Sequence, residues 1–262
     1  MIYKLAHKIT KHWLRKNLGK TSFAPILFDY KNIVNEGLNF GNDERIEIAE
    51  NYLITHLSQF YSSPLVIDVG ANMGEYSQKC LRGFLSPQIY AIEPCSSSFA
   101  QLSIVLNSQV SLHQIALSDF DGNATMYISE ANNKLNSLIK RTHSKHYWEQ
   151  GESVLTQTLD SFAETKNILS IDLLKIDAEG SEYTILLGAS NLLKGKKINH
   201  IQFEFGGAML SSRHFFKDFY DLLSHNYQIF YLLNDGIYPI NQYHEKLENF
   251  CGNNFYAKLR QD

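Results

Sequence analysis

The residues best suited to chemistry are four that alternate along one short segment and an acid further on. Asp68, Gly70, Asn72 and Gly74 follow an apolar run that predicts a buried strand, and they precede a predicted helix. Glycines at such a turn let the backbone bend sharply and let a ligand approach it closely. Glu93 follows the next predicted strand, 25 residues after Asp68, where a carboxylate can accept hydrogen bonds from both hydroxyl groups of a ribose. Together these residues predict a site for a nucleoside cofactor.

The order of residues in this loop favours a cationic ligand over a dinucleotide. Dinucleotide-binding turns follow the pattern Gly-x-Gly-x-x-Gly, whose helix N-terminus holds a pyrophosphate. Here Asn72 occupies the position of the middle glycine. Asp68 places a negative charge close to where phosphate groups would lie, and like charges repel. The amino group and sulfonium of S-adenosylmethionine suit this site, so we expect this cofactor rather than NAD.

Alternating apolar runs and helical patterns predict the scaffold that positions these residues. Strands are expected over residues 65–69, 89–92, 110–117, 124–128, 171–176 and 198–205. Helices are expected between most of them, and segments 227–232 and 254–259 can close the sheet as an antiparallel hairpin. The pattern predicts an α/β fold with a Rossmann-like doubly wound sheet, and the terminal hairpin is typical of class I methyltransferases. We expect residues 1–60 to form a helical N-terminal extension and residues 61–262 the cofactor-binding domain.

Five short motifs, taken in order and spacing, resemble the FkbM-type family of class I S-adenosylmethionine-dependent methyltransferases. They lie at residues 66–74, 92–94, 116–119, 158–160 and 174–182. The sequence Lys-Ile-Asp-x-Glu-Gly at residues 175–180 is the most family-specific of them. The resemblance covers about residues 64–206, and it reaches neither the N-terminal segment nor the aromatic C-terminal region.

The resemblance implies a role for each matching residue. Asp68, Gly70, Asn72 and Gly74 would line the amino-acid and sulfonium part of the cofactor, and Glu93 would hold its ribose. The segment after the third strand, with Ser118 and Asp119, would lie at the edge of the adenine. Asp177 would lie beside the transferred methyl group. Members of the family mostly O-methylate hydroxyl groups of sugars, glycans or polyketide-type natural products, so a small-molecule or glycan acceptor is expected.

A hydroxyl acceptor needs a base, because it must lose a proton as it attacks the methyl group. Asp177 follows the fourth strand of the predicted Rossmann core on the crevice side, and Glu204 lies near the end of the fifth. We expect Asp177 to be the base and Glu204 to be the alternative. Glu179 can instead cap the following helix near Gly180.

Two further features of the site stay open. Residues 129–151 are polar and predict a long surface loop, from which His143 or His146 could reach over the site. Asp177 and Glu204 could also hold Mg²⁺ and lower the pKa of the hydroxyl group. The sequence shows no third ligand with recognisable spacing, so we expect no metal.

Composition limits the class of protein. The chain has 262 residues, of which 44% are hydrophobic and 19% charged, with a net charge of −3. These values indicate a folded protein, and the lack of a basic balance argues against a nucleic-acid partner. The three cysteines are scattered, which fits a reducing, cytoplasmic compartment. No apolar run approaches the length of a membrane span.

The N-terminus differs from the rest of the chain in charge. Residues 1–20 hold six of the 24 basic residues and none of the 27 acids, so the remainder carries 18 basic and 27 acidic residues. Ile2, Leu5, Ile9 and Trp13 recur at helical spacing. Such a helix can pack on its own domain, or it can make weak peripheral contact with an anionic membrane.

The sequence therefore predicts a methyltransferase that O-methylates a hydroxyl group. Three alternatives stay open: an inactive Rossmann-like binding or scaffold module, a NAD-dependent oxidoreductase, and N- or C-methylation of a small molecule. The oligomeric state is left open by the sequence.

Overall fold

The computed structural model describes residues 2–106, 110–129, 135–141 and 150–261, and the side chains of residues 2–7, 17 and 150 are not among the features described. Its centre is an eight-stranded sheet in the order β10-β9-β11-β8-β7-β1-β2-β3. The strands are β1 (Leu65–Val69), β2 (Gln88–Ile92), β3 (Ser111–His113), β7 (Ile171–Ile176), β8 (Ile198–Phe205), β9 (Tyr227–Leu233), β10 (Gly236–Ile240) and β11 (Asn253–Leu259).

The direction of the strands identifies the fold class. Strands β3, β2, β1, β7 and β8 run parallel to one another, whereas β11 lies antiparallel between β8 and β9. β10 pairs with β9 as a hairpin at the edge of the sheet. A parallel sheet with one reversed strand inserted near its end confirms the predicted Rossmann-like sheet of the class I methyltransferase type.

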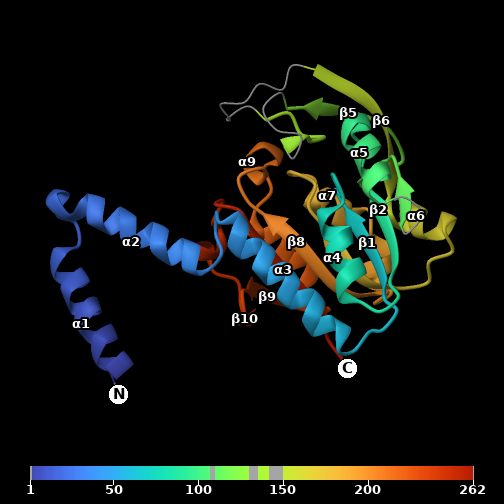
Figure 1. The fold of residues 1–262 in the computed structure, drawn as a ribbon. Helices are drawn as coiled ribbons and strands as arrows, with labels where there is room; N and C mark the ends of the chain where they lie inside the picture. Colours follow the sequence, from blue (N-terminus) through green and yellow to red (C-terminus); the bar gives the residue numbers. More distant parts are fainter. Residues whose placement is uncertain (1, 107–109, 130–134, 142–149, 262) are drawn as a thin grey trace.

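Helices cover both faces of the sheet, which makes it doubly wound (Figure 1). One face packs against α3 (Asp43–Ser58), α4 (Glu75–Gly83) and α5 (Ser96–Leu106). The other face packs against α6 (Leu159–Thr165), α7 (Glu182–Leu187), α8 (Ser190–Lys194) and α10 (Phe216–Leu223). Neighbours in β1 divide between the two layers: Val66 joins the first and Ile67 the second, because successive strand residues point to opposite faces.

A second, three-stranded sheet differs from the sequence prediction. It contains β4 (Ala116–Ser118), β5 (Gly122–Ile128) and β6 (Gln150–Thr158), in the order β4-β6-β5. The strand predicted over residues 110–117 is divided, so that β3 joins the main sheet and β4 joins this one. The expected loop over 129–151 overlaps the first two residues of β6, whose polar sequence hides the strand from an apolar pattern.

The predicted N-terminal extension consists of two dissimilar parts. Helix α3 lies on the body, with Leu53 and Leu57 in the core. Helices α1 (Ile2–Asn17) and α2 (Ala24–Gly37), joined through the short helix η1 (Thr21–Phe23), project away from the body as an arm (Figure 1). Among the described helices, including the short α9 (Met209–Ser212) and η4 (Glu245–Leu247), none has the length and apolar content needed to traverse a bilayer. The domain boundary at residue 60 stays a prediction.

Candidate active site

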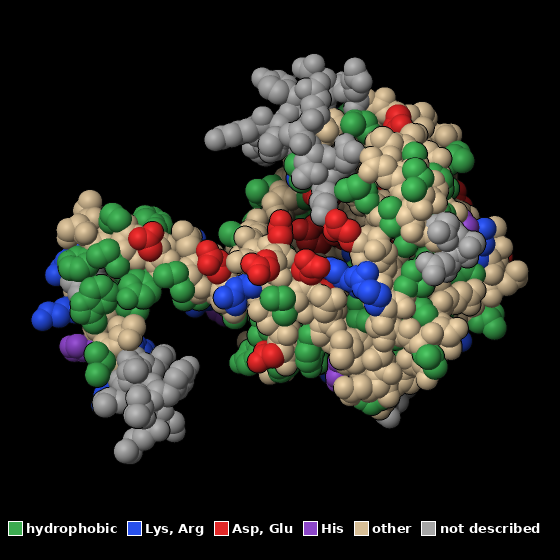
Figure 2. Space-filling model, viewed as in Figure 1, with side chains coloured by type: hydrophobic (Ala, Val, Ile, Leu, Met, Phe, Trp, Pro, Cys, Tyr) green, Lys and Arg blue, Asp and Glu red, His purple; other side chains and the backbone are tan. Residues whose placement is uncertain are grey.

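A cavity of about 510 Å³ opens where the parallel strands end. Its walls include the loop after β1, Glu93 after β2, Asp177 after β7 and Glu204 near the end of β8. Figure 2 shows acidic side chains gathered around a hollow in the face of the body turned toward the reader. Ligands of open α/β sheets bind outside the carboxyl ends of the strands, so this is the expected location of a site.

The loop between β1 and α4 fits its neighbours only with glycine at two positions. Gly70 has φ of +74°, and a Cβ atom there would lie 1.8 Å from the backbone oxygen of Asp177. Gly74 has φ of +87°, and a Cβ atom there would lie 2.9 Å from the Cδ1 atoms of Leu102 and Leu106. Gly70 therefore brings the loop against the end of β7 and lines the cavity, whereas Gly74 packs against α5.

Glu93 presents a carboxylate to the cavity. Its Oε2 atom accepts a hydrogen bond from the backbone N–H of Asn72, and its Oε1 atom accepts one from the backbone N–H of Cys95, both at 2.9 Å. Burial raises the pKa of Glu93 to about 7, although these two bonds act in the opposite direction. Each carboxylate oxygen has a second lone pair, so Glu93 can also accept hydrogen bonds from a ligand.

Apolar residues form the wall next to Glu93. Cys95, Ala116 and Met126 belong to one small buried cluster, and the last two line the cavity. Ser118 and Asp119 are not among the described residues that line it, and the Ser118 hydroxyl donates to Asp119 Oδ1 at 3.2 Å. In the segment that contains this pair, the described residues that line the cavity are Ala116 and Leu117.

Asp68 lies behind the cavity wall. Its Oδ2 atom accepts a hydrogen bond from the Ser77 hydroxyl at 2.7 Å, and its Oδ1 atom lies 3.3 Å from Nζ of Lys175. Asp68 is fully buried and is not one of the described lining residues, whereas Lys175 lines the cavity. The negative charge of Asp68 is therefore balanced by Lys175, and the Asp68 carboxylate does not face the cavity directly.

Lys175 is the site residue that the sequence reasoning missed. Burial opposes its charge, but the carboxylates of Asp177, Asp68 and Glu50 raise its pKa above the ordinary value. The signal was present in the sequence, because Lys175 interrupts an apolar strand. A lysine is almost never buried unless it is paired.

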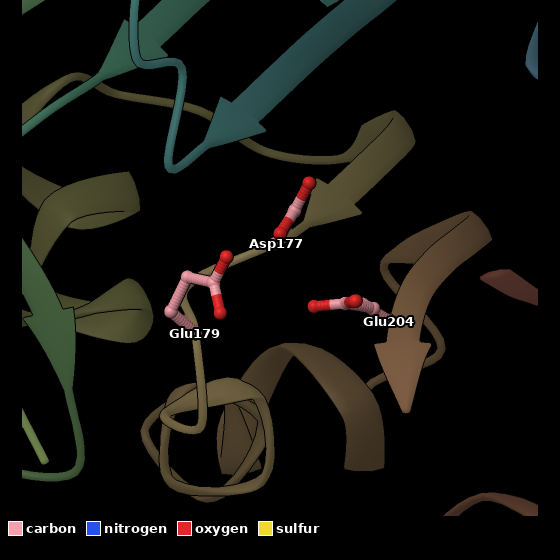
Figure 3. Close-up of side chains that lie close together, drawn as sticks. All are labelled: Asp177, Glu179 and Glu204. Atoms are coloured by element: carbon pink, nitrogen blue, oxygen red, sulfur yellow. The ribbon is translucent and has the colours of Figure 1, made fainter. Parts of the chain in front are cut away.

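Three carboxylates converge at one end of the cavity (Figure 3). Oxygens of Asp177, Glu179 and Glu204 all lie within 4.8 Å of one another. The Oδ2 atom of Asp177 lies 3.5 Å from Nζ of Lys175. The Asp177 side chain is 38% exposed, whereas the Lys175 side chain is buried. The structure thus brings together the two predicted candidates for the base and adds Glu179 to them.

Mutual repulsion and burial oppose ionisation of Glu204 and Glu179. Burial, reinforced by the charges of Asp177 and Glu179, raises the pKa of Glu204 well above its ordinary value. Burial and the charge of Asp177 raise the pKa of Glu179 to about 7, although Arg141, which forms an ion pair with it, acts in the opposite direction. When acidic groups lie this close together, the charge of one disfavours ionisation of the next.

Glu182, rather than Glu179, holds the loop before α7. Its Oε1 atom accepts a hydrogen bond from the backbone N–H of Ala178 at 2.8 Å, and its Oε2 atom accepts one from Gly180 at 2.9 Å. The suggestion that Glu179 caps this helix is therefore wrong. Glu179 has φ of +53°, a conformation that turns its side chain toward Arg141 instead.

Residues 135–141 form one edge of the cavity. The Ser137 hydroxyl donates to the backbone oxygen of Glu179 at 2.7 Å, and Arg141 pairs with the Glu179 carboxylate. Leu138 and Arg141 line the cavity. His143 and His146, considered as residues that could reach over the site, lie outside the described residues.

The acidic cluster has the donor set of a cation site. Three carboxylate groups with oxygens this close can ligate Mg²⁺ or Ca²⁺. The sequence reasoning expected no metal because it recognised no third ligand, and Glu179 supplies one. The expectation of no metal stays a prediction. Arg141 and Lys175 place positive charge beside these carboxylates.

The cavity fits S-adenosylmethionine in size and in chemistry. Sites for ligands of this size typically enclose about 300–1,000 Å³. Glu93 is placed to accept from ribose hydroxyl groups, and Ala116 and Met126 offer an apolar surface for the adenine. Asp177 offers a negative charge at the other end, where the amino and sulfonium groups would lie.

Comparison with known proteins agrees with this assignment. The model of the Methyltransferase FkbM domain matches residues 68–229. Methyltransferase 1 of Beauveria bassiana (strain ARSEF 2860) is 25% identical over 151 residues, which cover 50% of this chain and 61% of that protein. The 2-O-methyltransferase NoeI of Sinorhizobium fredii (strain NBRC 101917 / NGR234) is 24% identical over 143 residues, which cover 50% of this chain and 59% of that protein. The chain thus covers less than two thirds of the length of either relative.

Solved structures resemble the chain at low sequence identity. The O-methyltransferase from Bacillus cereus in complex with SAH is 10% identical, with a TM-score of 0.45 and 97% of both chains covered. The plantazolicin methyltransferase BpumL in complex with SAH is 10% identical, with a TM-score of 0.42 and 98% of both chains covered.

The family assignment rests on the sequence match. The matched segment runs from Asp68 to the start of β9, so it spans more than half of the chain and contains both Glu93 and the three carboxylates of the cluster. The chain belongs to the FkbM family of S-adenosylmethionine-dependent methyltransferases.

Proposed function

We propose that this methyltransferase acts on oxygen and methylates a hydroxyl group of a sugar, glycan or natural product. The observation that carries the proposal is the convergence of Asp177, Glu179 and Glu204 within 4.8 Å at one end of the cavity. Bound S-adenosylmethionine supplies an activated methyl group. A neutral hydroxyl group must lose its proton as it attacks, and a carboxylate within reach can accept that proton. The relative described as a 2-O-methyltransferase supports the same choice.

We assign cofactor binding to two groups of residues. Gly70, Asn72 and Glu93 line the cavity and would contact the cofactor directly. The other predicted binding residues lie behind this wall and would position it: Asp68, Gly74, Ser118 and Asp119. Substitutions in the first group should lower the affinity for the cofactor directly. Substitutions in the second group should lower it mainly by changing the geometry of the loops.

We assign the base to Asp177. Lys175 stabilises its negative charge from 3.5 Å, and its side chain is open to the cavity. Burial and the neighbouring carboxylates raise the pKa of Glu204 well above its ordinary value, and in its protonated form Glu204 can donate a hydrogen bond to the acceptor oxygen. The two residues then orient one hydroxyl group between them, and orientation alone can supply about 7–11 kcal/mol of a barrier reduction.

The charge of the walls favours a neutral or amino-bearing acceptor. Asp43, Glu47 and Glu75 line the same cavity as the carboxylate cluster. An acceptor that carries a carboxylate or a phosphate would be repelled by these side chains. Neutral sugars and amino sugars would not be repelled.

The test is turnover with a panel of acceptors. We would measure S-adenosylhomocysteine formation with neutral, amino and acidic sugars, using the wild type, Asp177→Asn and Glu204→Gln. Asp177→Asn should lower kcat about 10²–10⁴-fold, as loss of a general base does. Its affinity for S-adenosylhomocysteine should fall far less than kcat does, because loss of the base acts on the transition state and S-adenosylhomocysteine has no sulfonium charge for Asp177 to attract.

A matched control is Glu245→Gln. The Glu245 side chain is 81% exposed in η4 and pairs with His244, away from the described lining residues. It should keep wild-type turnover. Binding of S-adenosylhomocysteine without turnover of any hydroxyl acceptor would argue against O-methylation, and a lack of binding would favour the scaffold alternative.

A further inference from the structure

Helices α1 and α2 form an arm. In the contacts described, the arm is held to the body at the C-terminal end of α2. Asn249 donates a hydrogen bond to the side-chain oxygen of Asn35 at 3.3 Å, and Asn253 donates one to the backbone oxygen of Leu38 at 2.9 Å. From this point α2 leads away from the body, and α1 lies beyond it (Figure 1). Where the side chains of α2 are described, none is buried.

The arm exposes a continuous apolar stripe. Ile26, Tyr30, Ile33 and Val34 of α2 follow one another at the spacing of one helix face, and Ile33 and Val34 are 62% and 58% exposed. Single exposed apolar residues are common, but an unbroken stripe on a helix marks an interaction surface. The sequence left open whether the N-terminal helix packs on its own domain. For the described part of the arm, the exposure of these side chains argues against that alternative.

The stripe extends into α1 across the elbow. Trp13 contacts Phe23 of η1 edge to face, with ring centroids 5.7 Å apart. Ile9, one helical turn before Trp13, is 61% exposed. Figure 2 shows the hydrophobic side chains of the arm gathered on the face turned toward the reader. Two helices therefore offer one apolar surface.

The opposite side of α1 is basic. Lys8, Lys11 and Arg15 are exposed, and their spacing places them on the helix face away from Ile9 and Trp13. The first 20 residues hold six basic and no acidic side chains, while the rest of the chain has an excess of acids. An anionic partner is thus attracted by the arm and repelled by the body.

We propose that the arm docks this protein onto an anionic membrane surface. A helix with one apolar and one basic face lies in the plane of the interface, with its apolar face among the lipid tails and its lysines at the headgroups. The apolar stripe of α2 enlarges the buried area beyond what α1 alone provides. The arm holds seven basic and two acidic residues, so pairing of two arms would bring a net charge of +5 against +5, which disfavours a second copy as the occupant. The proposal is independent of the acceptor chemistry at the active site.

The experiment is co-sedimentation of the full chain with lipid vesicles. One set contains phosphatidylglycerol and phosphatidylcholine, and the other contains phosphatidylcholine alone. We expect binding to the first set, more than about tenfold weaker binding to the second, and release at high salt, because salt screens the attraction.

Two arm variants separate the contributions of charge and apolar contact. Lys8→Glu with Lys11→Glu and Arg15→Glu reverses the basic face, and Ile26→Ser with Ile33→Ser interrupts the stripe. Each should weaken binding to the anionic vesicles more than about tenfold. Leu169→Ser, which changes a side chain that is 83% exposed on the body, is the matched control and should bind as the wild type does.

Unchanged affinity for S-adenosylhomocysteine in every variant would show that the body remains folded. The proposal would be overturned if the wild type ignored anionic vesicles, or if both arm variants bound them as tightly as the control. It would also be overturned if sedimentation velocity gave a wild-type dimer that Ile26→Ser with Ile33→Ser dissociated, because the stripe would then be covered by a second copy.

Discussion

Lys175 and Asp68 are register partners on neighbouring strands, and the Nζ atom of Lys175 lies 3.3 Å from Oδ1 of Asp68. The same Nζ atom lies 3.5 Å from Oδ2 of Asp177 and 3.5 Å from the backbone oxygen of Gly70. One buried cation thus connects the strand that begins the cofactor loop to the carboxylate that we assign as the base. The loop and the base are held in one geometry because they share this ion.

Replacing Lys175 should be strongly destabilising. Lys175→Met leaves the fully buried Asp68 carboxylate without its cation, and breaking a buried ion pair by removing one partner costs about 3–5 kcal/mol. The free energy of unfolding in urea measures this loss. Lys258→Met is the matched control, because Lys258 also lies in a strand but is exposed, and it should change stability by less than about 0.5 kcal/mol.

A second variant separates the ion pair from the fold around it. Asp68→Asn combined with Lys175→Met removes both charges, so it should recover part of the stability that Lys175→Met alone loses. If the double variant were as unstable as the sum of the two single variants, the pair would not be the source of the effect.

Gly70 should not tolerate even a methyl group. Gly70→Ala places an L residue at φ of +74° and a Cβ atom 1.8 Å from the backbone oxygen of Asp177. The conformation alone costs about 1–2 kcal/mol, and the collision must move the loop, so we expect Tm to fall by more than about 4 °C. Affinity for S-adenosylhomocysteine should fall as well.

The control for this change is Gly236→Ala. A Cβ atom at Gly236 would meet nothing within 4 Å, and its φ lies outside the left-handed region. Tm and affinity should therefore stay close to those of the wild type. Equal losses in the two variants would mean that the contact between the loop and β7 is not the cause.

Cofactor affinity should depend on pH through Glu93. Burial raises the pKa of Glu93 to about 7, and only the ionised carboxylate accepts hydrogen bonds at both oxygens. Affinity for S-adenosylhomocysteine should therefore be full above pH 7 and fall as the pH drops through that value. Calorimetric titration from pH 5.5 to 8.5 measures the dependence.

Glu93→Gln cannot ionise, so it should bind more than about tenfold more weakly at pH 8 and lose most of the pH dependence. Glu245→Gln should keep the wild-type profile. A Glu93→Gln protein with the wild-type affinity and slope would remove Glu93 from the ribose site.

The sequence predicted the central scaffold because its strands are buried on both faces. Strands such as β1 and β2 are mainly apolar runs bounded by turns, a pattern that needs no knowledge of neighbours. β6 was missed because polar residues dominate it and its pairing with β5 is a long-range relationship. Periodicity cannot report which distant segment completes a sheet.

The candidate site was predicted in part for a similar reason. Position at the end of a strand was enough to place Glu93, Asp177 and Glu204 at the cavity. The direction of a side chain was not predictable, so Asp68 was expected at the ligand although it turns toward Lys175. Arg141 reaches the cluster from a segment with no regular pattern, and only the folded chain brings it to Glu179.

Activity should not require a divalent metal. Arg141 and Lys175 each lie beside a carboxylate of the cluster, and burial raises the pKa of Glu204, which disfavours a negative charge on the third. The charge that would attract a cation is therefore largely matched by the protein. Turnover should be unchanged after dialysis against EDTA, with or without added Mg²⁺. Loss of turnover that Mg²⁺ restores would instead make the cluster a metal site.

Arg141 should set the pH at which the cluster becomes active. Its positive charge lowers the pKa of Glu179 against the effect of burial, so Arg141→Gln should raise that pKa further. The cluster then keeps its protons to higher pH, and the rising limb of kcat against pH should move upward by about one unit or more. Arg82→Gln, which changes an exposed arginine of α4, should keep the wild-type profile. A uniform fall in kcat with no shift of the limb would mean that Arg141 only holds residues 135–141 in place.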